Sequence, residues 1–187
     1  MADHRCPVWV GYLMANPIRK LRQSPARILN GLISPGMTVL DLGCAMGFFS
    51  LPMARMAGAN GRVICADVQQ KMLDALERRA RRRGFSDRIL LHRCQDASIG
   101  LPDFGRQVDF ALAFAVIHEV TDPRTYFQEL YDLLKNGGRL LFAEPTGHVD
   151  PSSFQASLEL ATSAGFSSVD SPAISWSRAA LLEKTSG

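Results

Sequence analysis

Short runs of apolar residues alternate along this chain with segments whose apolar positions recur every three or four residues. The runs are typical of strands buried on both faces, and the longer period is typical of helices that bury one face. Such strands are predicted at 38–42, 62–66, 88–94, 108–114 and 139–143. The helices predicted between them span roughly 47–58, 70–83 and 123–135. Strands that alternate with helices through short connections predict a doubly wound, Rossmann-like α/β sheet.

The pattern changes at both ends of the chain. Residues 152–164 predict one more helix, and 166–184 predict two strands around Ser171 and Pro172. These strands would give a mostly parallel sheet an antiparallel C-terminal edge. A further helix is predicted at 25–33. We therefore expect a single domain, 1–187, made of an N-terminal helical flap (1–34) and a Rossmann-like core (35–187).

The helix predicted at 123–135 has clear signals at both ends. Asp122 is suited to cap its N-terminus, and Pro123 is suited to the first helical position. Asn136, Gly137 and Gly138 form a typical stop.

Composition narrows the classes of function. A hydrophobic content of 47% and a charged content of 21% are ordinary for a soluble globular protein, and a net charge of +3 does not by itself indicate a nucleic-acid partner. The four cysteines, at 6, 44, 65 and 94, include no CxxC pair and no zinc-type spacing. No metal site is predicted, and a reducing cytoplasm is the expected location.

The apolar N-terminal stretch CPVWVGYLMA does not fit a targeting or membrane-spanning segment. It is too short to span a bilayer, it is broken by Pro7 and Gly11, and the acidic Asp3 precedes it. Trp9 and Tyr12 are therefore interpreted as part of a flap over the acceptor pocket, where they are candidate substrate contacts. Contact with a membrane surface is the alternative.

The connection after the first strand is the first place where chemistry is indicated. Residues 38–50 read TVLDLGCAMGFFS, so that Gly43 ends the strand and Gly47 opens the predicted helix. Two glycines allow a tight bend that brings backbone amides close to a ligand at a helix N-terminus. We interpret the turn as a cofactor cradle, the alternative being an ordinary turn whose glycines only ease packing.

Asp67 closes the second strand, twenty-four residues after Gly43, about where an acidic residue would accept both hydroxyls of a ribose. The alternative is an N-cap of the following helix. Ala45 stands where a dinucleotide-binding turn has its middle glycine, and a carboxylate at Asp41 would repel a pyrophosphate. The same carboxylate would favour S-adenosylmethionine, which carries a sulfonium and an ammonium group.

Five signals along the chain then carry a family resemblance. They are VLDLGCAMG at 39–47, Asp67, QDA at 95–97, DFALAFAVIHEV at 109–120 and LLKNGGRLLFAEP at 133–145. In this order and at these distances they resemble the motifs of class I S-adenosylmethionine-dependent methyltransferases, most closely the ubiquinone/menaquinone-biosynthesis ("type 11") kind. The resemblance covers residues 38–145.

The resemblance implies a set of cofactor-binding residues. They are Asp41, Gly43, Cys44, Ala45 and Gly47 around the methionyl end, Asp67 at the ribose, Val68, Asp96 and Ala97 at the adenine, and Phe114 on the methionine side. The chain departs from the family pattern at Ala45, where glycine is usual, and at Phe114, where a small residue or an aspartate is usual.

Three polar residues fall at strand ends beyond the cofactor positions: His118, Glu144 and His148. An imidazole can remove a proton near neutral pH, so His118 is the candidate catalytic base, with Glu144 and His148 as candidate substrate contacts. The alternative for His118 is a packing role at the start of a helix. A two-histidine, one-carboxylate metal site is disfavoured, because nothing local fixes the spacing.

The basic run ERRARRR at 77–83, with Arg88, predicts a solvated helix face. A nucleic-acid partner is not predicted, because no aromatic residue is interleaved with these arginines.

Together these features predict an enzyme that transfers the methyl group of S-adenosylmethionine to a small-molecule acceptor. Catalysis is expected to come chiefly from alignment and desolvation, with help from a base if the acceptor carries a proton. The alternatives are a nicotinamide-dependent oxidoreductase on the same fold and a cofactor-binding module without transfer activity.

Overall fold

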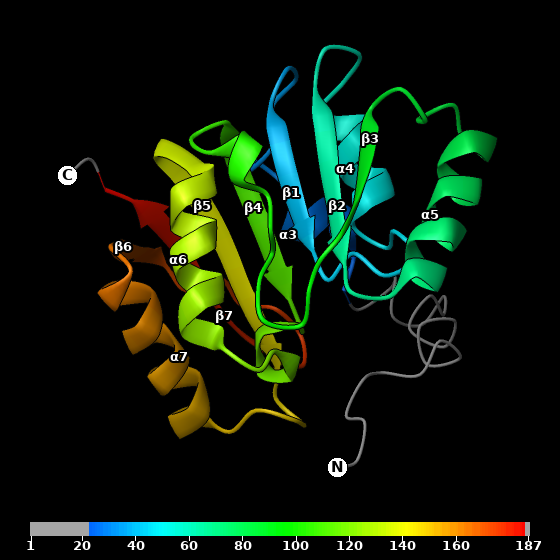
Figure 1. Cartoon of the computed structure of the whole chain (residues 1–187). Coiled ribbons are helices and arrows are strands. Elements are labelled where there is room, and N and C mark those ends of the chain that lie inside the picture. Colours follow the sequence, from blue (N-terminus) through cyan, green and yellow to red (C-terminus); the bar gives the residue numbers. More distant parts are fainter. Residues whose placement is uncertain (1–22, 186–187) are drawn as a thin grey trace.

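A computed structural model of the chain describes residues 23–185. Within this range seven strands form one sheet, in the order β3-β2-β1-β4-β5-β7-β6 (Figure 1). The strands are β1 (Thr38–Leu42), β2 (Arg62–Asp67), β3 (Ile89–Arg93), β4 (Val108–Phe114), β5 (Leu134–Pro145), β6 (Phe166–Asp170) and β7 (Ser177–Lys184). The helices are α3 (Pro25–Ile28), α4 (Ser50–Met56), α5 (Gln70–Arg82), α6 (Pro123–Leu133) and α7 (Pro151–Ser163), with short 3-10 turns η1 (Pro102–Phe104) and η2 (Ile117–Glu119).

The direction of strand pairing confirms the predicted fold class. Strand β1 pairs in parallel with β2 on one side and with β4 on the other, so the strand order reverses beside β1. Strand β5 is parallel to β4 but antiparallel to β7, which is in turn antiparallel to β6. In open α/β sheets a ligand binds at the carboxyl ends of the strands beside such a reversal, here the ends of β1 and β4.

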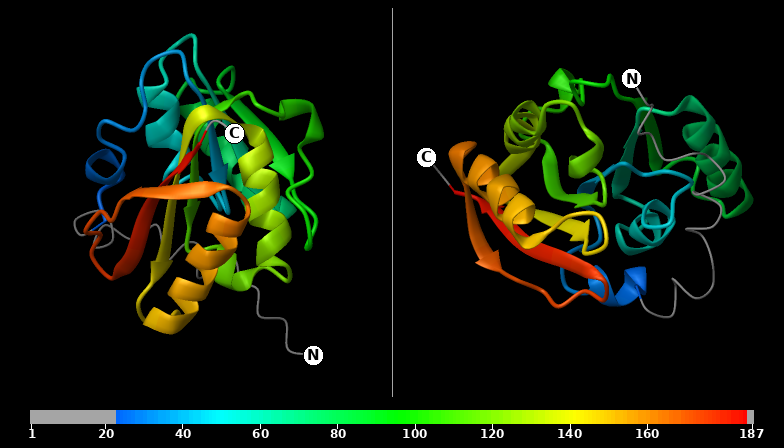
Figure 2. Two further views of the ribbon diagram at one scale, coloured as in Figure 1. Left: turned by 90° about the vertical axis from the view of Figure 1, so that its left-hand side faces the viewer. Right: turned by 90° about the horizontal axis from the view of Figure 1, so that it is seen from below.

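Helices cover both faces of the sheet and create two hydrophobic clusters. Alternate strand residues point to opposite faces: Leu40 and Ile64 pack with α6 and α7, whereas Val39 and Val63 pack with α4 and α5. Figure 2 shows α6 and α7 on one side of the sheet and α3 and α4 on the other. Strands β1, β2 and β4 are buried on both faces, which explains why their sequences are nearly continuous hydrophobic runs.

Two helices begin or end elsewhere than predicted. Helix α4 starts at Ser50 rather than at 47, because Ala45 (φ 44°) and Gly47 (φ 82°) adopt left-handed conformations that no α-helix contains. Helix α3 ends at Ile28 rather than at 33, shortly before Gly31 (φ 74°) turns the chain.

The ends of α6 show one confirmed signal and one error. The side chain of Asp122 caps the helix by accepting a hydrogen bond from the Thr125 amide at 3.2 Å. The predicted stop at Asn136–Gly138 is wrong, because the helix ends at Leu133 and Leu134 already pairs with Val108 in the sheet. The glycines instead lie within β5, opposite a register shift in β4.

The first 22 residues lie outside the described range. The flap prediction for 1–34, with Trp9 and Tyr12 as substrate contacts, therefore stays a prediction. Among the described residues, none of the helices is long and apolar enough to cross a bilayer.

Candidate functional site

The loop from Gly43 to Gly47 joins β1 to α4 and requires glycine at both ends. Gly43 has a φ of 69°, and a Cβ atom added there would lie 2.8 Å from a side-chain carbon of Val116. Gly47 has a φ of 82°, and an added Cβ would clash with the side chain of Leu76. Both positions exclude a side chain by conformation and by space. The glycines therefore allow the loop to lie close to Val116, just after β4, and to Leu76 of α5.

The backbone amides of this loop are directed to protein acceptors. Those of Gly43 and Cys44 donate to the Ala66 carbonyl at 2.9 and 3.1 Å, and that of Gly47 donates to the Cys44 carbonyl at 2.9 Å. The Ala45 amide donates to a carboxylate oxygen of Asp67 at 2.9 Å. These amides are therefore not free to bind a pyrophosphate, which needs such donors.

Asp67 ties the end of β2 to the loop. One carboxylate oxygen accepts the Ala45 amide, and the other accepts the Gln69 amide at 2.8 Å. The side chain is buried, which raises the pKa of the carboxyl group, and the backbone hydrogen bonds oppose the increase. The capping alternative is not supported, since the residue at the N-cap of α5 is Gln69. Each carboxylate oxygen keeps a further lone pair, so Asp67 retains the acceptors that two ribose hydroxyls require.

Asp41 lies beneath the loop and is 2% exposed. The Ser50 hydroxyl donates to its carboxylate at 2.5 Å. Burial, opposed by this hydrogen bond and assisted by the negative charge of Asp67, raises the pKa of Asp41 to about 7. Because this pKa is raised, Asp41 repels a pyrophosphate less than a fully charged carboxylate would.

The remaining residues with an implied cofactor role lie on several elements. Asp96 and Ala97 are exposed in the turn after β3, and Val68 is half-buried at the end of β2. The buried ring of Phe114 packs against that of Phe49, with their centroids 4.9 Å apart. Cys44 is buried as well, which raises the pKa of its thiol well above the usual value and keeps it neutral.

A histidine and a buried glutamate meet at the carboxyl ends of β4 and β5. Nδ1 of His118, in η2, lies 2.6 Å from Oε2 of Glu144, in β5. The other carboxylate oxygen of Glu144 accepts the backbone amide of His118 at 3.2 Å. Glu144 is 1% exposed, whereas the His118 side chain keeps 21% of its exposure. The carboxylate therefore fixes the orientation of an imidazole that stays partly exposed, with Nε2 3.9 Å from Oε1 of Glu119.

The charges around His118 favour its protonated form. The hydrogen bond that the His118 ring donates to Glu144 raises the pKa of His118, partial burial opposes this, and the charges of Glu144 and Glu119 add to the increase. The ring of His148 stands edge-on to that of His118, with centroids 5.8 Å apart. The structure thus brings together the three predicted residues His118, Glu144 and His148. Among the described residues no group of three or more His, Cys, Asp or Glu is arranged to bind a metal ion.

Three residues of the site carried no recognisable signal in the sequence. Ser50 is the hydrogen-bond partner of Asp41, and Val116 fills the space against Gly43. Ala115 adopts a φ of 58°, which turns the chain immediately after β4. Alanine rarely takes this conformation, so neither its type nor its spacing predicts it.

The strand order, the antiparallel β7 and the loop at the reversal beside β1 define a Rossmann-like methyltransferase fold. A family model described as "Methyltransferase domain" matches residues 33–176. The chain belongs to this methyltransferase-domain family.

Two similar proteins are named as methyltransferases. Over 148 residues the chain is 32% identical to the ubiquinone biosynthesis O-methyltransferase of Dinoroseobacter shibae, a match that covers 75% of this chain and 56% of that protein. Over 109 residues it is 32% identical to a ubiquinone/menaquinone biosynthesis C-methyltransferase of Pectobacterium carotovorum, covering 57% and 41%. The chain thus spans about half the length of the curated relatives it matches.

A solved structure extends the likeness to the whole fold. The SAM-dependent methyltransferase from Aquifex aeolicus superposes with a TM-score of 0.84 at 21% identity, over 97% of this chain and 100% of that one. The resemblance predicted from the five sequence signals is therefore confirmed at the level of family and fold.

Proposed function

We propose that the protein transfers the methyl group of S-adenosylmethionine to a small-molecule acceptor whose reacting atom carries a proton. The observation that carries this proposal is the His118–Glu144 pair, held at 2.6 Å beside the cofactor loop. Val116, two residues before His118, lies against Gly43 of that loop, so the base and the loop belong to one site.

The residues of the loop region suit this cofactor better than a dinucleotide. Asp67 offers carboxylate lone pairs to a ribose, while the loop amides that a pyrophosphate would need already donate to Ala66, Cys44 and Asp67. Asp41 and the glycine loop would adjoin the methionyl end, and Val68 with Asp96 the adenine. When bound, S-adenosylmethionine supplies an electrophilic methyl group on a positively charged sulfur.

His118 would act on the acceptor as a general base. Its Nε2 would remove the proton of the attacking group as the new bond to carbon forms, which prevents a positive charge from developing on that group. Glu144 would hold the ring through Nδ1 and stabilise the imidazolium that results. A base of this kind must be neutral before the reaction, so the pair should work best above the raised pKa of His118.

The relatives suggest the type of acceptor. Both are named for quinone biosynthesis, and one is named for transfer to oxygen. An aromatic hydroxyl group has a proton acidic enough for a histidine to remove, so we propose a phenolic acceptor. The buried free cysteines Cys44, Cys65 and Cys94 support a reducing location such as the cytoplasm.

A panel of phenols and catechols, each paired with its fully methylated ether, tests the proposal. Release of S-adenosylhomocysteine is measured with the full chain. We expect turnover with at least one free hydroxyl compound and none with the matching ether, which lacks the proton. Tight binding of S-adenosylmethionine without transfer to any acceptor would instead favour the cofactor-binding module.

A further inference from the structure

The turn that follows β3 begins next to the end of β2. Residues 95–98 form this turn, and Asp96 and Ala97 at its tip are exposed. The backbone amide of Cys94, directly before the turn, donates to the Asp67 carbonyl at 3.0 Å. The turn therefore starts beside the residue to which the proposed function assigns the ribose.

Glu129 of α6 fixes the end of this turn through three hydrogen bonds. Its Oε1 accepts the Ser98 hydroxyl at 2.6 Å. Its Oε2 accepts the backbone amides of Ile99 and Gly100 at 2.6 and 3.1 Å. Hydrogen bonds to a carboxylate are shorter and stronger than those between neutral groups. One side chain thus attaches the end of the turn to α6.

Two further side chains from the same region hold the start of the turn. The Tyr126 hydroxyl donates to the Gln95 carbonyl at 3.0 Å. The Thr121 hydroxyl donates to the Asp96 carbonyl at 3.1 Å. Tyr126 and Glu129 are three positions apart on α6 and therefore share one face of the helix. An exposed turn that is held at both ends keeps its conformation before a ligand arrives, which lowers the entropy lost on binding.

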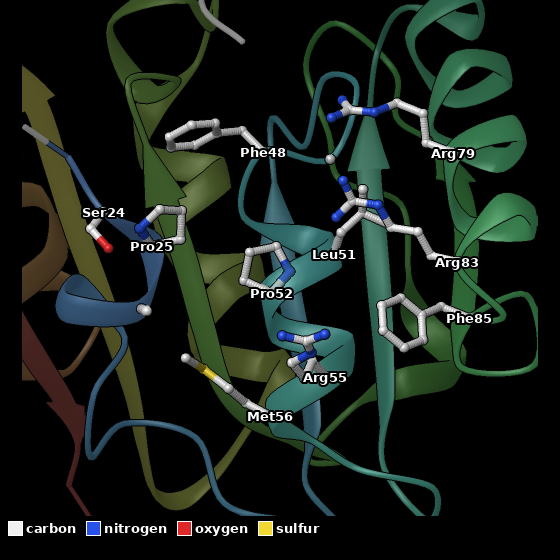
Figure 3. Close-up of a pocket in the computed structure, with 12 residues that line it drawn as sticks. Ser24, Pro25, Phe48, Leu51, Pro52, Arg55, Met56, Arg79, Arg83 and Phe85 are labelled. Carbon is white, nitrogen blue, oxygen red and sulfur yellow. The ribbon is translucent and has the colours of Figure 1, made fainter. Parts of the chain in front are cut away.

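The loop from Gly43 to Gly47 is also held by a charged side chain from a helix. A guanidinium nitrogen of Arg79, on α5, donates to the backbone carbonyl of Met46 in this loop. Figure 3 shows the side chain of Arg79 extending from α5 toward the loop that leads into α4. The two segments proposed to adjoin the cofactor are thus supported from different helices, the loop from α5 and the turn from α6.

We propose that Glu129 is a positioning residue for the cofactor, which holds the turn in the conformation that selects an adenine base. The inference rests on the proposed function, in which Asp96 adjoins the adenine. Glu129 acts through the turn, because its carboxylate oxygens are bonded to a hydroxyl and two amides of that segment. Its loss should therefore weaken recognition of the base and leave the contacts of Asp67 with the ribose in place.

The test compares two ligands of the full chain by calorimetry. They are S-adenosylhomocysteine and S-inosylhomocysteine, whose base carries an oxygen in place of the 6-amino group. The wild type should prefer the adenine compound at least about tenfold, because a site that matches one pattern of donors and acceptors disfavours the reverse pattern. Glu129→Ala should weaken binding of S-adenosylhomocysteine about tenfold and that of S-inosylhomocysteine less than about threefold, so that most of the preference is lost.

Three further variants separate positioning from general stability. Glu129→Gln keeps an oxygen for the two amides and gains a nitrogen donor for the Ser98 hydroxyl, so its affinity for S-adenosylhomocysteine should stay within about threefold of the wild type. Tyr126→Phe removes only the hydroxyl that holds Gln95 and should reduce the preference in the same direction. This variant decides the proposal if Glu129→Ala does not fold. Glu159→Ala, the same substitution at an exposed position of α7, should change neither affinity.

Equal binding of S-adenosylhomocysteine by the wild type and Glu129→Ala would overturn the proposal. An equal loss of affinity for both ligands would also overturn it, because such a loss indicates a general role in stability, which thermal unfolding of the variants measures separately. A wild type that does not distinguish the two ligands would contradict selection of the base. If the wild type bound no S-adenosylhomocysteine, the cofactor of the proposed function would be wrong and this inference with it, so the two failures are distinguishable.

Discussion

Two buried carboxylates stand at the edge of the sheet where ligands bind, and their partners differ. Asp67, at the end of β2, accepts backbone amides of Ala45 and Gln69, which are fixed donors that do not titrate. Glu144, in β5, accepts from the ring and the amide of His118, and this ring gains and loses a proton near neutral pH. The first carboxylate fixes the shape of a loop, and the second controls the charge of a side chain.

The two halves of this edge of the sheet are therefore suited to different tasks. The β1–β2 half presents a rigid loop suited to hold a cofactor by shape and hydrogen bonds. The β4–β5 half presents an oriented imidazole suited to move a proton. Each half includes an alanine in the left-handed region, Ala45 at 44° and Ala115 at 58°, so backbone strain is present on both sides of the site. Separate substitutions should therefore affect binding and transfer independently.

The largest expected effect is on transfer, through His118. The substitution His118→Asn keeps an amide donor for Glu144 but removes the base, and a positioned base contributes roughly 10²- to 10⁴-fold to the rate. We expect kcat to fall within that range while the affinity for S-adenosylhomocysteine, measured by calorimetry, is unchanged. Gln128→Ala, at an exposed position of α6, is the control. A decrease in kcat of less than about threefold for His118→Asn would reduce His118 to a packing role.

The next effect is on cofactor affinity, through Asp67. Two hydrogen bonds to a carboxylate contribute roughly 2 to 4 kcal/mol together, so Asp67→Ala should weaken binding of S-adenosylhomocysteine about tenfold to a thousandfold. Asp87→Ala, at an exposed aspartate distant from the loop in sequence, serves as the control. If Asp67→Ala bound S-adenosylhomocysteine as tightly as the wild type, Asp67 would not be the residue that binds the ribose.

The pH dependence of transfer sharpens the contrast between the two carboxylates. Glu144 raises the pKa of His118, and the neutral ring is the base, so kcat/KM should rise with pH through a value above the ordinary histidine pKa. Glu144→Gln should move this rise to lower pH and reduce the plateau about tenfold, as for the loss of one charge-assisted hydrogen bond. A profile that does not move in Glu144→Gln would contradict the coupling.

The same pair contributes to folding with a defined sign. A histidine whose pKa is raised in the folded state stabilises the fold fully below its unfolded pKa and loses that contribution as the pH rises through the folded value. The difference in unfolding free energy between wild type and Glu144→Gln should therefore shrink as the pH rises.

The smallest expected effect is on stability, through Ala45. Glycine avoids the left-handed strain of about 1 to 2 kcal/mol that alanine bears, but it increases the entropy of the unfolded chain by roughly 0.4 to 1 kcal/mol. Ala45→Gly should therefore raise the free energy of unfolding by up to about 1 kcal/mol. Ala156→Gly, on the exposed face of α7, should lower it by about the same amount. Destabilisation by Ala45→Gly would contradict the strain.

The centre of the sheet is predicted well from the sequence because β1, β2 and β4 are buried on both faces. The segments 38–42 and 108–114 are almost wholly buried, so their hydrophobic runs are hardly interrupted by polar residues. Asp122 and Pro123 mark the start of α6, where Asp122 caps the helix. The errors lie at glycines. The stop signal at Asn136–Gly138 became an irregular stretch of β5, because pairing of Leu134 with Val108 extends the sheet across it.

The site was predicted as a set of positions but not as a set of contacts. Spacing placed Asp67, His118 and Glu144 at strand ends, since parallel strands end at a common edge. Spacing does not show that Ser50 would cover Asp41, or that the loop amides would turn to Ala66. Those contacts depend on left-handed turns and on packing between segments distant in sequence, which no local pattern encodes.

The class of cofactor is the claim on which the account depends, and calorimetric titration of the full chain tests it directly. S-Adenosylhomocysteine, NAD and NADP are titrated separately under the same conditions. Because the amides of Gly43, Cys44, Ala45 and Gly47 are engaged within the protein, we predict micromolar binding of S-adenosylhomocysteine and none of either dinucleotide. Micromolar binding of NAD or NADP without binding of S-adenosylhomocysteine would contradict the account.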